Sequence, residues 1–538
     1  QNTALGYSAL FCNTTAGCNT AVGFCSLYTN TTGSCNTAVG RFAMLLNTTG
    51  ATNTAVGHNS LHSNTTAADN TAVGVFSLYA NLTGANNTAV GRNSLCANTT
   101  GASNVAVGTS ALAANTSAVS NTAVGHLALR YNTTGTQNTA VGKSAMTSNT
   151  TGGYSVAVGN NALQTQTTGA NNVAIGRTAL AALTTGTRNT VVGGAYALGA
   201  GAAMTTGYHN VLVGNDAGGT MTTGFNNTGV GTESLKLLTT GAHNTAIGDK
   251  ALCALTTANS NTAVGRHSMY ATTTATNNTA VGTDTLAANT TGAENTAVGA
   301  GALASTTTAC CNVAVGASTG SDVTTGKENV FVGLGAGGGT ITTGCRNTFI
   351  GMNAGRNGTA TSNSVAIGYG AYTDNTDGNV ELVIAHATQG CGSNTFTFGK
   401  ASNKVHNNFA TNASWTRTSD LRLKKNIKNS DLGLDFIDKL RPVTYNWKPS
   451  NEIDKELTSE YNKENNKDTE TTMNGLIAQE VKQALLDSGV SETEVKNYGV
   501  WTENKKSGIQ EISREMFVIP LINAIKELTK RIKDLEDK

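Results

Sequence analysis

Over most of its length this 538-residue sequence has little proline, few aromatic side chains and little charge. Aromatic residues make up 5% of the chain, and all three prolines lie after residue 418. With so few large side chains and 62 glycines, most of the chain cannot build an ordinary large globular core. Residues 1–418 carry 26 charged side chains and residues 419–538 carry 42, so two different kinds of protein meet near residue 418.

Long apolar runs and a strong net charge are also missing. No run approaches the ~20 apolar residues that a membrane helix needs, and no basic-then-apolar start resembles a signal peptide. The net charge of +2 argues against a nucleic acid or an anionic membrane as partner. The sequence therefore predicts neither membrane insertion nor nucleic-acid binding. It begins inside a repeat at Gln1-Asn2, so we expect an upstream region that joins it to an anchoring protein.

The ten cysteines show no Cys-x-x-Cys spacing of the kind that holds a metal, and we predict no metal site and no cofactor. Cys18 and Cys35 stand at the same place in consecutive copies of a sequence repeat. On stacked turns their Cα atoms would be ~4.8 Å apart, which is within the range that a disulfide permits. Their side chains would be parallel rather than convergent, and this favours free thiols.

What the sequence does contain is that repeat. The phrase Asn19-Thr20-Ala21-Val22-Gly23 returns at Asn36 and Asn53, with a period of 17, and continues to Ser364 in 22 copies. Of the 21 intervals between copies, 19 equal this period, one is 21 and one is 18. A constant period of this size is typical of stacked repeat architectures, and we call each copy a rung and number its places from the opening residue.

The first half of each rung reads as a strand followed by a corner. Places two and four are Thr or Val and then Val or Ile, a period-two pattern that predicts a short strand, and the Gly at place five ends it. A Leu or Met at place nine, such as Leu27 or Met44, predicts one large aliphatic side chain per rung in the interior. We expect the Ala at place three to point away from this core and to form an outer stripe for close packing against sister chains.

The second half reads Asn-Thr-Thr-Gly, as at Asn30–Gly33, which predicts a turn. A helix is the competing interpretation for segments such as Ser110–Ala114, but Gly108 and Asn115 leave too few residues for a stable helix. So short a rung can bury its apolar side only against identical rungs. The sequence therefore predicts a mainly β fold, a parallel β-solenoid with stacked Val, Leu and Asn ladders.

The same reading sets the domain boundaries. We predict a solenoid shaft over residues 1–368, a β neck over residues 369–418 where the period is lost, and a small α+β domain over residues 419–538. Four rungs have Gly at place nine: Gly218, Gly320, Gly337 and Gly355. In the first three we expect the apolar filler to move to Met221, Val323 and Ile341, with a local change in cross-section.

Two groups of polar residues in the shaft could carry function. Asp216 and Glu233 occupy the same place on adjacent rungs, so their carboxylates could lie ~5 Å apart as in retaining glycosidases. They lie in a Gly- and Thr-rich row without an aromatic sugar platform, which favours an ordinary surface row. A basic row after the glycine corners could meet anionic glycans, although a solvated face that keeps a fibre soluble is the simpler interpretation. This row contains Arg41, His58, Arg92, His126, Lys143 and Arg177.

Two rungs carry a resemblance to a known family. The phrases Ser155-Val156-Ala157-Val158-Gly159 and Ser364-Val365-Ala366-Ile367-Gly368 resemble the head repeats of trimeric autotransporter adhesins, the YadA-like head. The resemblance implies a left-handed solenoid in which three chains pack together. We therefore expect a homotrimer.

Residues 419–538 resemble a second family. Three motifs carry this resemblance: Ser419–Lys424, Leu440–Lys448 and Gly475–Val481. In order and spacing they are similar to the endosialidase-type intramolecular chaperone domain, which caps phage tail spikes and fibres, helps three chains to register and then cuts itself off. By the pattern of that family, Ser419 is the nucleophile, Lys424 is its base, and the bond that is cut joins Thr418 to Ser419.

Two further residues match this pattern. Asp420 and Arg422 occupy the other fixed places of the motif, and the resemblance implies that they support the reaction. Taken alone, a Ser near a Lys can form a nucleophile and a base, but an ordinary exposed linker is the alternative. A Lys- and Glu-rich insertion near residues 454–470 departs from the family, and we expect a loop that leaves the motif intact.

The end of the chain has the pattern of a coiled coil. Apolar residues are spaced 3, 4, 3, 4 and 3 apart, beside Pro520 at a predicted helix start. They are Val518, Leu521, Ile525, Leu528, Ile532 and Leu535. A helix packed only on its own domain is the alternative, whereas three such helices would bring three chains into equal register.

Together these patterns predict a homotrimeric fibre or spike of a virion, located outside the cell and attached through an upstream anchoring protein. It would bind a host cell-surface receptor, a glycan in our interpretation. The only chemistry that we expect is a single self-cleavage. A polysaccharide-depolymerising tailspike and a cellular trimeric adhesin are the alternatives.

Overall fold

The computed structural model describes residues 1–194, 199–339, 341–356, 362–374, 380–401, 403–409, 416–417, 421, 424–455, 461, 463–464, 469–504 and 508–538. The chain divides into two compact units, Gln1–Thr418 (unit 1) and Ser419–Lys538 (unit 2). Each unit is described by itself.

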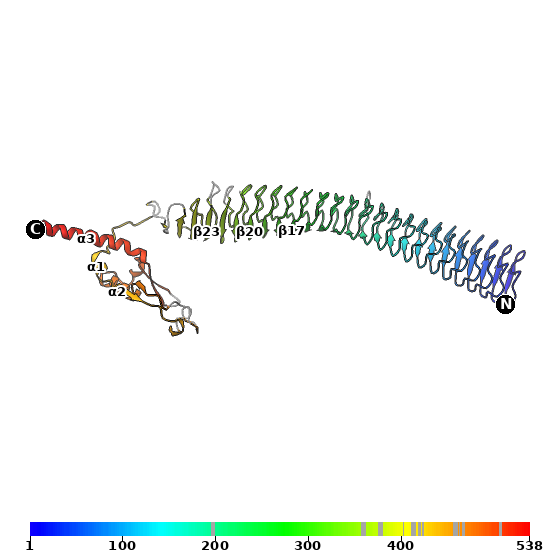
Figure 1. Ribbon diagram of the computed structural model, residues 1–538, viewed down its shortest axis with the longest axis horizontal. Coiled ribbons are helices and arrows are strands. Elements are labelled where there is room, and N and C mark those ends of the chain that lie inside the picture. Colours follow the sequence, from blue (N-terminus) through cyan, green and yellow to red (C-terminus); the bar gives the residue numbers. More distant parts are fainter. Residues whose placement is uncertain are drawn as a thin grey trace. The chain divides into compact units, whose positions relative to one another are not determined.

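Unit 1 has one short strand in every rung. The strands of the 22 rungs are β1 Thr3–Leu5, β2 Thr20–Val22, β3 Thr37–Val39, β4 Thr54–Val56, β5 Thr71–Val73, β6 Thr88–Val90, β7 Val105–Val107, β8 Thr122–Val124, β9 Thr139–Val141, β10 Val156–Val158, β11 Val173–Ile175, β12 Thr190–Val192, β13 Val211–Val213, β14 Thr228–Val230, β15 Thr245–Ile247, β16 Thr262–Val264, β17 Thr279–Val281, β18 Thr296–Val298, β19 Val313–Val315, β20 Val330–Val332, β21 Thr348–Ile350 and β22 Ser364–Ile367. Each strand pairs in parallel with that of the next rung, place for place, as in Thr20 with Thr37. Figure 1 shows these strands stacked as a ladder. The predicted parallel β-solenoid, with one turn per sequence repeat, is confirmed.

The prediction for the Ala at place three is wrong. Ala21, Ala123 and Ala297 are completely buried, whereas Val124 and Val298, at place four of their strands, are 36% and 37% exposed. The side chains alternate as predicted, but with the opposite phase. The large side chain from place nine fills the interior and leaves room for only a methyl group on the strand. The outer stripe therefore consists of the Thr, Val and Ile side chains of places two and four.

The interior contains ladders of buried asparagine as well as leucine. At place one, the backbone N–H of Asn36 donates to Asn19 Oδ1 at 2.9 Å, and Asn36 Nδ2 donates to the carbonyl of Gly50 at 2.8 Å. At place twelve, Asn47 Nδ2 donates to Asn30 Oδ1 at 2.8 Å and to the Gly50 carbonyl at 2.9 Å, which closes the predicted turn. These amides are satisfied by their neighbours on adjacent rungs, so their burial carries no unpaired polar group.

The corners depend on left-handed backbone. Gly125 has φ of 135°, and a Cβ there would lie 2.5 Å from the carbonyl oxygen of Gly142 on the next rung. Ser110 and Leu112 also have positive φ, of 56° and 50°, so the segment Ser110–Ala114 is a turn and not a helix. All ten cysteines are free thiols, Cys18 and Cys35 included.

In the rungs with Gly at place nine, the interior is filled by side chains from another place. A Cβ on Gly218 would lie 2.8 Å from Leu212 Cδ1, and one on Gly355 would lie 2.2 Å from Phe349 Cδ2. Leu212, Phe331 and Phe349 stand at place three, where other rungs have Ala, and all three are completely buried. Met221, Val323 and Ile341 are buried as well, but at place twelve or its equivalent, where they continue the position of the second Asn ladder. The three expected fillers are therefore buried, but the space of the missing Leu is taken by a larger strand residue. Leu212, Phe331 and Phe349 take it in their own rungs, and Phe331 also lies against Gly320 of the preceding rung, which keeps Ala314.

The parallel ladder does not stop where the sequence period is lost. β23 (Glu381–His386) pairs in parallel with β22, and β24 (Thr395–Lys400) pairs in parallel with β23. The direction then reverses, because β25 (Asn403–Asn408) and β26 (Thr416–Arg417) are antiparallel.

At this end Glu381 takes the position of the ladder Asn. Its carboxylate is buried and accepts the backbone N–H groups of Asp374 and Gly392, each at 2.9 Å. Burial raises the pKa of Glu381 above its usual range, and these N–H groups oppose the rise.

Unit 2 is a small α+β unit. Its elements are α1 Leu434–Asp438, β27 Val443–Tyr445, η2 Ser450–Glu452, β28 Met473–Gly475, α2 Ala478–Asp487, η3 Val495–Asn497, β29 Trp501–Glu503, β30 Gln510–Ile512, η4 Arg514–Phe517 and α3 Val518–Glu536. β27 pairs with β28 and β29 with β30, both antiparallel. The core contains Phe436, Leu485, Trp501 and Phe517, with the rings of Phe436 and Phe517 stacked at 6.1 Å.

The size compensation between Leu212 at place three and Gly218 at place nine can be tested by a double-mutant cycle. Leu212→Ala leaves a cavity beside Gly218, and we expect a loss of about 2–5 kcal/mol in local stability. Gly218→Leu alone should also destabilise, because its side chain would overlap Leu212. The double variant recreates the Ala and Leu pair of a regular rung such as Ala123 and Leu129, where Leu129 has a similar φ of 51°.

We therefore expect the double variant to recover most of the lost stability. Hydrogen exchange of the amides in β13 measures stability in this rung alone, which suits a repeat protein. Losses that simply add in the double variant would contradict this account of the interior.

Candidate assembly and processing site

The predicted processing residues run from Thr418, the last residue of unit 1, to Lys424 of unit 2. Thr418, Ser419, Asp420 and Arg422 lie outside the described residues. Lys424 is described: its side chain is exposed, and its backbone N–H donates to the Leu421 carbonyl at 3.1 Å. A lysine that serves as a base has to be neutral, and removal from water is the usual way to achieve this. In the single chain the Lys424 side chain is exposed to water and does not have these surroundings.

The other two motifs lie side by side although they are far apart in sequence. β27, from the motif Leu440–Lys448, pairs with β28, whose last residue opens the motif Gly475–Val481. The guanidinium of Arg441 binds the carboxylate of Glu480 with two hydrogen bonds, one of them Nε to Oε2 at 3.1 Å. The bond from Arg441 lowers the pKa of Glu480 below its usual range. This bidentate pair joins the two motifs at the surface, and the sequence did not reveal it.

Helix α3 is fixed to α1 by polar contacts on one of its faces. Asn523 Nδ2 donates to the Leu432 carbonyl at 2.9 Å and to the Ser430 carbonyl at 3.3 Å. The Glu527 carboxylate accepts the backbone N–H of Leu434 at 3.1 Å, at the first residue of α1. An acidic group at this end of a helix satisfies an otherwise unpaired N–H. Sequence analysis missed both residues, since nothing in the heptad pattern distinguishes them from other surface positions.

The heptad residues lie on another face of α3, and they are exposed. Ala524 and Pro520 are buried, whereas Ile525 is 61% exposed and Leu528 is 45% exposed. The other members of the heptad, Val518, Leu521, Ile532 and Leu535, are also exposed. We call these six residues the seam. α3 thus packs on its own domain, and the described residues of that domain leave the apolar seam exposed.

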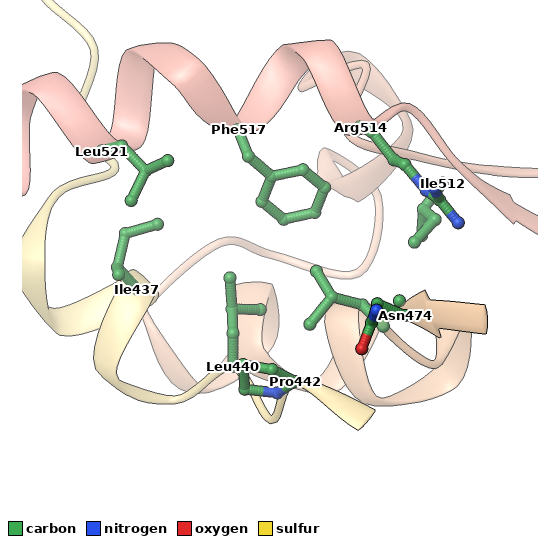
Figure 2. A pocket seen from close by; sticks show the side chains of 10 residues that line it. Ile437, Leu440, Pro442, Asn474, Ile512, Arg514, Phe517 and Leu521 are labelled. Atoms are coloured by element: carbon green, nitrogen blue, oxygen red, sulfur yellow. The ribbon is translucent and has the colours of Figure 1, made fainter. Parts of the chain in front are cut away.

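A pocket of about 400 Å³ lies beside the first turn of the seam. Figure 2 shows Leu521 and Phe517 of α3 and η4 across from Ile437 and Leu440, with Arg514 near Ile512 at the far end. Its walls are mainly aliphatic and aromatic. Leu521 therefore borders both the pocket and the seam, which makes the apolar surface continuous around the start of α3.

The comparison with protein families decides what this unit is. Residues 419–490 match the peptidase S74 family, the chaperone of endosialidase. The chain thus carries an endosialidase-type chaperone domain after a long β-solenoid, as the three motifs predicted. Comparison with curated proteins and with solved structures gave no match. The family match covers α1, α2 and the paired motifs of the chaperone domain, and α3 follows it.

The described part of the chain shows neither of two other features, a membrane-spanning helix and a metal site. Within the ranges given above, no helix is long and apolar enough to cross a membrane. Within the same ranges, no group of three or more His, Cys, Asp or Glu side chains is arranged to hold a metal ion.

In the candidate carboxylate pair of the shaft, Glu233 is paired with lysine side chains. Asp216 and Glu233 do lie on adjacent rungs, with the Glu233 N–H donating to the Asn215 carbonyl at 2.8 Å. Lys236 Nζ lies 2.7 Å from one Glu233 carboxylate oxygen, and Lys250 Nζ lies 3.9 Å from the other. The bond from Lys236 lowers the pKa of Glu233, so this carboxylate stays ionised. Glu233 thus serves as the partner of two lysines, which fits the ordinary surface row favoured by the sequence.

The exposed seam makes a direct prediction for the chaperone domain. In the variant Ile525→Asp with Leu528→Asp, two charges enter the seam, and we expect the protein to stay monomeric because a desolvated carboxylate is costly in a coiled-coil core. Lys526→Gln with Lys530→Gln changes the net charge by the same amount on exposed positions of the same helix and should remain trimeric. Native mass spectrometry measures the assembly, and circular dichroism checks the fold. Trimers of the seam variant at the wild-type concentration would contradict this role for the seam.

Proposed function

We propose that this protein is one subunit of a homotrimeric β-solenoid fibre of a virion, which binds a receptor on the host cell surface. Its chaperone domain directs trimerisation and is released by self-cleavage between Thr418 and Ser419. The exposed seam of α3 is the observation that carries the proposal. A chaperone domain whose described residues leave a complete heptad face exposed fits an assembly of three copies.

The outer stripe of the solenoid fits the same self-association. Val90, Val141 and Val281 at place four are 36%, 37% and 37% exposed, and a Val or Ile of similar exposure recurs in most rungs. Packing these faces together would contribute about 1 kcal/mol per rung from buried apolar area. Repeated over many rungs, this gain exceeds the cost of bringing three chains together. This stripe of β-branched residues replaces the Ala stripe expected from the sequence.

Register explains why such a fibre needs a chaperone. Every rung offers nearly the same stripe, so three chains shifted by one rung lose little contact energy locally. Three α3 helices that associate first would place the ends of the three solenoids level before the rungs form. Once folded, a rung is held by both neighbours, and the chaperone domain is no longer required.

Self-cleavage in this proposal follows the pattern of the family. Ser419 Oγ attacks the Thr418 carbonyl carbon while the Lys424 amine takes the hydroxyl proton, and the C–N bond breaks as the proton passes to the leaving Ser419 amine. The resulting ester between Thr418 and the Ser419 oxygen is then hydrolysed by water. The products are a shaft with a C-terminal carboxylate at Thr418 and a chaperone domain with a free amine at Ser419. Packing of three chains around Lys424 would supply the removal from water that the single chain lacks.

Cleavage is tested by the mass of the denatured protein. We expect the wild-type gene to yield a shaft that ends at Thr418 and a fragment that begins at Ser419, whereas Ser419→Ala and Lys424→Ala should leave one chain. Lys425→Ala removes a charge from the next exposed residue and should be cut normally. Assembly should survive all three changes. A wild-type protein that forms trimers but keeps its intact mass of 54.9 kDa for days would show that the domain is a chaperone without this reaction.

Truncation tests the separation of assembly from stability. A gene that ends at Thr418 should yield aggregates, because its solenoids fold without a common register. The same shaft, freed from the chaperone domain after folding, should stay soluble and folded. Size-exclusion chromatography with light scattering compares the two preparations. Soluble trimers of shaft length from the truncated gene would rule out the chaperone role.

A further inference from the structure

The basic row of the shaft is one continuous line on the surface. The backbone carbonyl at place six accepts a hydrogen bond from the backbone N–H at place seven of the next rung. Examples are Asn59 N–H to the Arg41 carbonyl at 3.0 Å and Ser110 N–H to the Arg92 carbonyl at 2.9 Å. The same bond links Lys143 to Asn161 at 3.0 Å. Place six is therefore stacked from rung to rung, with ~4.8 Å between neighbours. The basic residues of this line are one or two rungs apart, which places one cationic or imidazole side chain every ~5–10 Å.

Basic side chains greatly outnumber acidic ones in the rungs that carry this line. Residues 1–215 contain six Lys and Arg side chains and one acidic residue, Asp69. Asp69 stands in another row, where its carboxylate accepts the Thr52 hydroxyl at 2.5 Å. A sister chain in the trimer would bring the same excess of positive charge. The acidic residues of these rungs are therefore too few to balance the positive charge of the line, in one copy or in three.

The next part of the shaft differs in this respect. Residues 216–300 contain five acidic and three basic side chains. Some of these charges face each other: Lys236 and Lys250 Nζ lie 2.7 Å and 3.9 Å from the carboxylate oxygens of Glu233. The same fold thus accommodates balanced charge where it occurs, and the excess in the first twelve rungs is a local property of their sequence.

The chemistry of the line favours a sparsely charged anion over other partners. Duplex DNA carries one charge per ~1.7 Å of axis, a much higher density than the line could match. Neutral sugars are usually held by stacking on ring faces, but the stacked pair of rings in this row lies on rungs one and two, before the line begins. Tyr7 and Phe24 lie 5.4 Å apart with 12° between their planes. The guanidinium of Arg41 lies 4.7 Å from the ring centre of Phe42. Recognition here therefore depends on charge, which suits a polymer with one acidic group per one or two sugar rings.

We propose that the basic line of rungs three to eleven binds an acidic polysaccharide, with carboxylate or sulfate groups, that lies along the shaft. This inference rests on the proposed attachment function and names the chemical class of the receptor. Arg41, Arg92 and Lys143 are exposed and supply the cationic contacts at even intervals of three rungs. Arginine suits this role because its guanidinium can hold a carboxylate or a sulfate with two parallel hydrogen bonds.

The experiment measures binding of the full-length wild-type protein to immobilised polysialic acid, polygalacturonate and dextran sulfate, with neutral dextran and an oligothymidylate as comparisons. We expect at least one acidic polysaccharide to bind more tightly than the oligothymidylate, no binding to neutral dextran, and an affinity that falls as salt rises. The triple variant Arg41→Gln, Arg92→Gln, Lys143→Gln should lose about tenfold in affinity. The matched triple variant Lys236→Gln, Lys250→Gln, Arg266→Gln loses the same charge from later rungs and should stay within about twofold of the wild type.

Three results would overturn the inference: no binding of any acidic polysaccharide at low salt, equal losses in the two triple variants, or tighter binding of the oligothymidylate. The mass and oligomeric state of each preparation are measured in parallel. A cleaved, trimeric wild-type protein that binds none of the polysaccharides refutes this inference and leaves the proposed assembly intact. An uncut monomer refutes the proposed function itself.

Discussion

The shaft depends on amides stacked at the spacing of a β-ladder. Each Asn at place one accepts the backbone N–H of the next rung through its side-chain oxygen, as Asn19 does from Asn36, and donates to a turn carbonyl with its nitrogen. This arrangement holds only when rungs are in register, because a buried amide without its neighbour loses both bonds. The corner glycines impose the same spacing, since a side chain there would meet the carbonyl of the next rung. With the polar interior satisfied within one chain, the strand face is left to make contacts outside it.

In the proposed assembly, that regularity is the problem that the chaperone domain solves. A stripe of similar Val and Ile side chains offers many alternative alignments between chains, and only a feature outside the repeat can select one. The faces of α3 differ in their contacts. Asn523 and Glu527 fix the helix to its own domain, whereas Ile525 and Leu528 remain exposed. A helix held in this way presents its seam in a defined orientation.

The sequence predicted the fold well because the repeat leaves few choices. The constant period, the strand at places two to four and the turn at Asn-Thr-Thr-Gly all follow from local rules, and the structure has them. The phase of the strand was predicted wrongly, because alternation alone cannot tell which side is inside. The size of the residue decides it: Ala fits beside Leu129, whereas Leu212 requires Gly218.

Less of the candidate site could be predicted. The motifs identified the chaperone domain, but nothing in them reveals that Arg441 binds Glu480 or that Glu527 contacts α1, since such contacts depend on tertiary structure. Thr418, Ser419, Asp420 and Arg422 are placed by resemblance alone and lie outside the described residues.

The central claim is that three solenoids pack through the β-branched stripe of their strands. Electron cryo-microscopy of the purified shaft tests it most directly, because the averaged cross-section shows both the number of chains and the face that each turns inward. We predict three chains around a threefold axis, with Val124 and its equivalents at the centre and Lys143 on the outside. A single solenoid, or a trimer with the stripe facing solvent, would contradict the account.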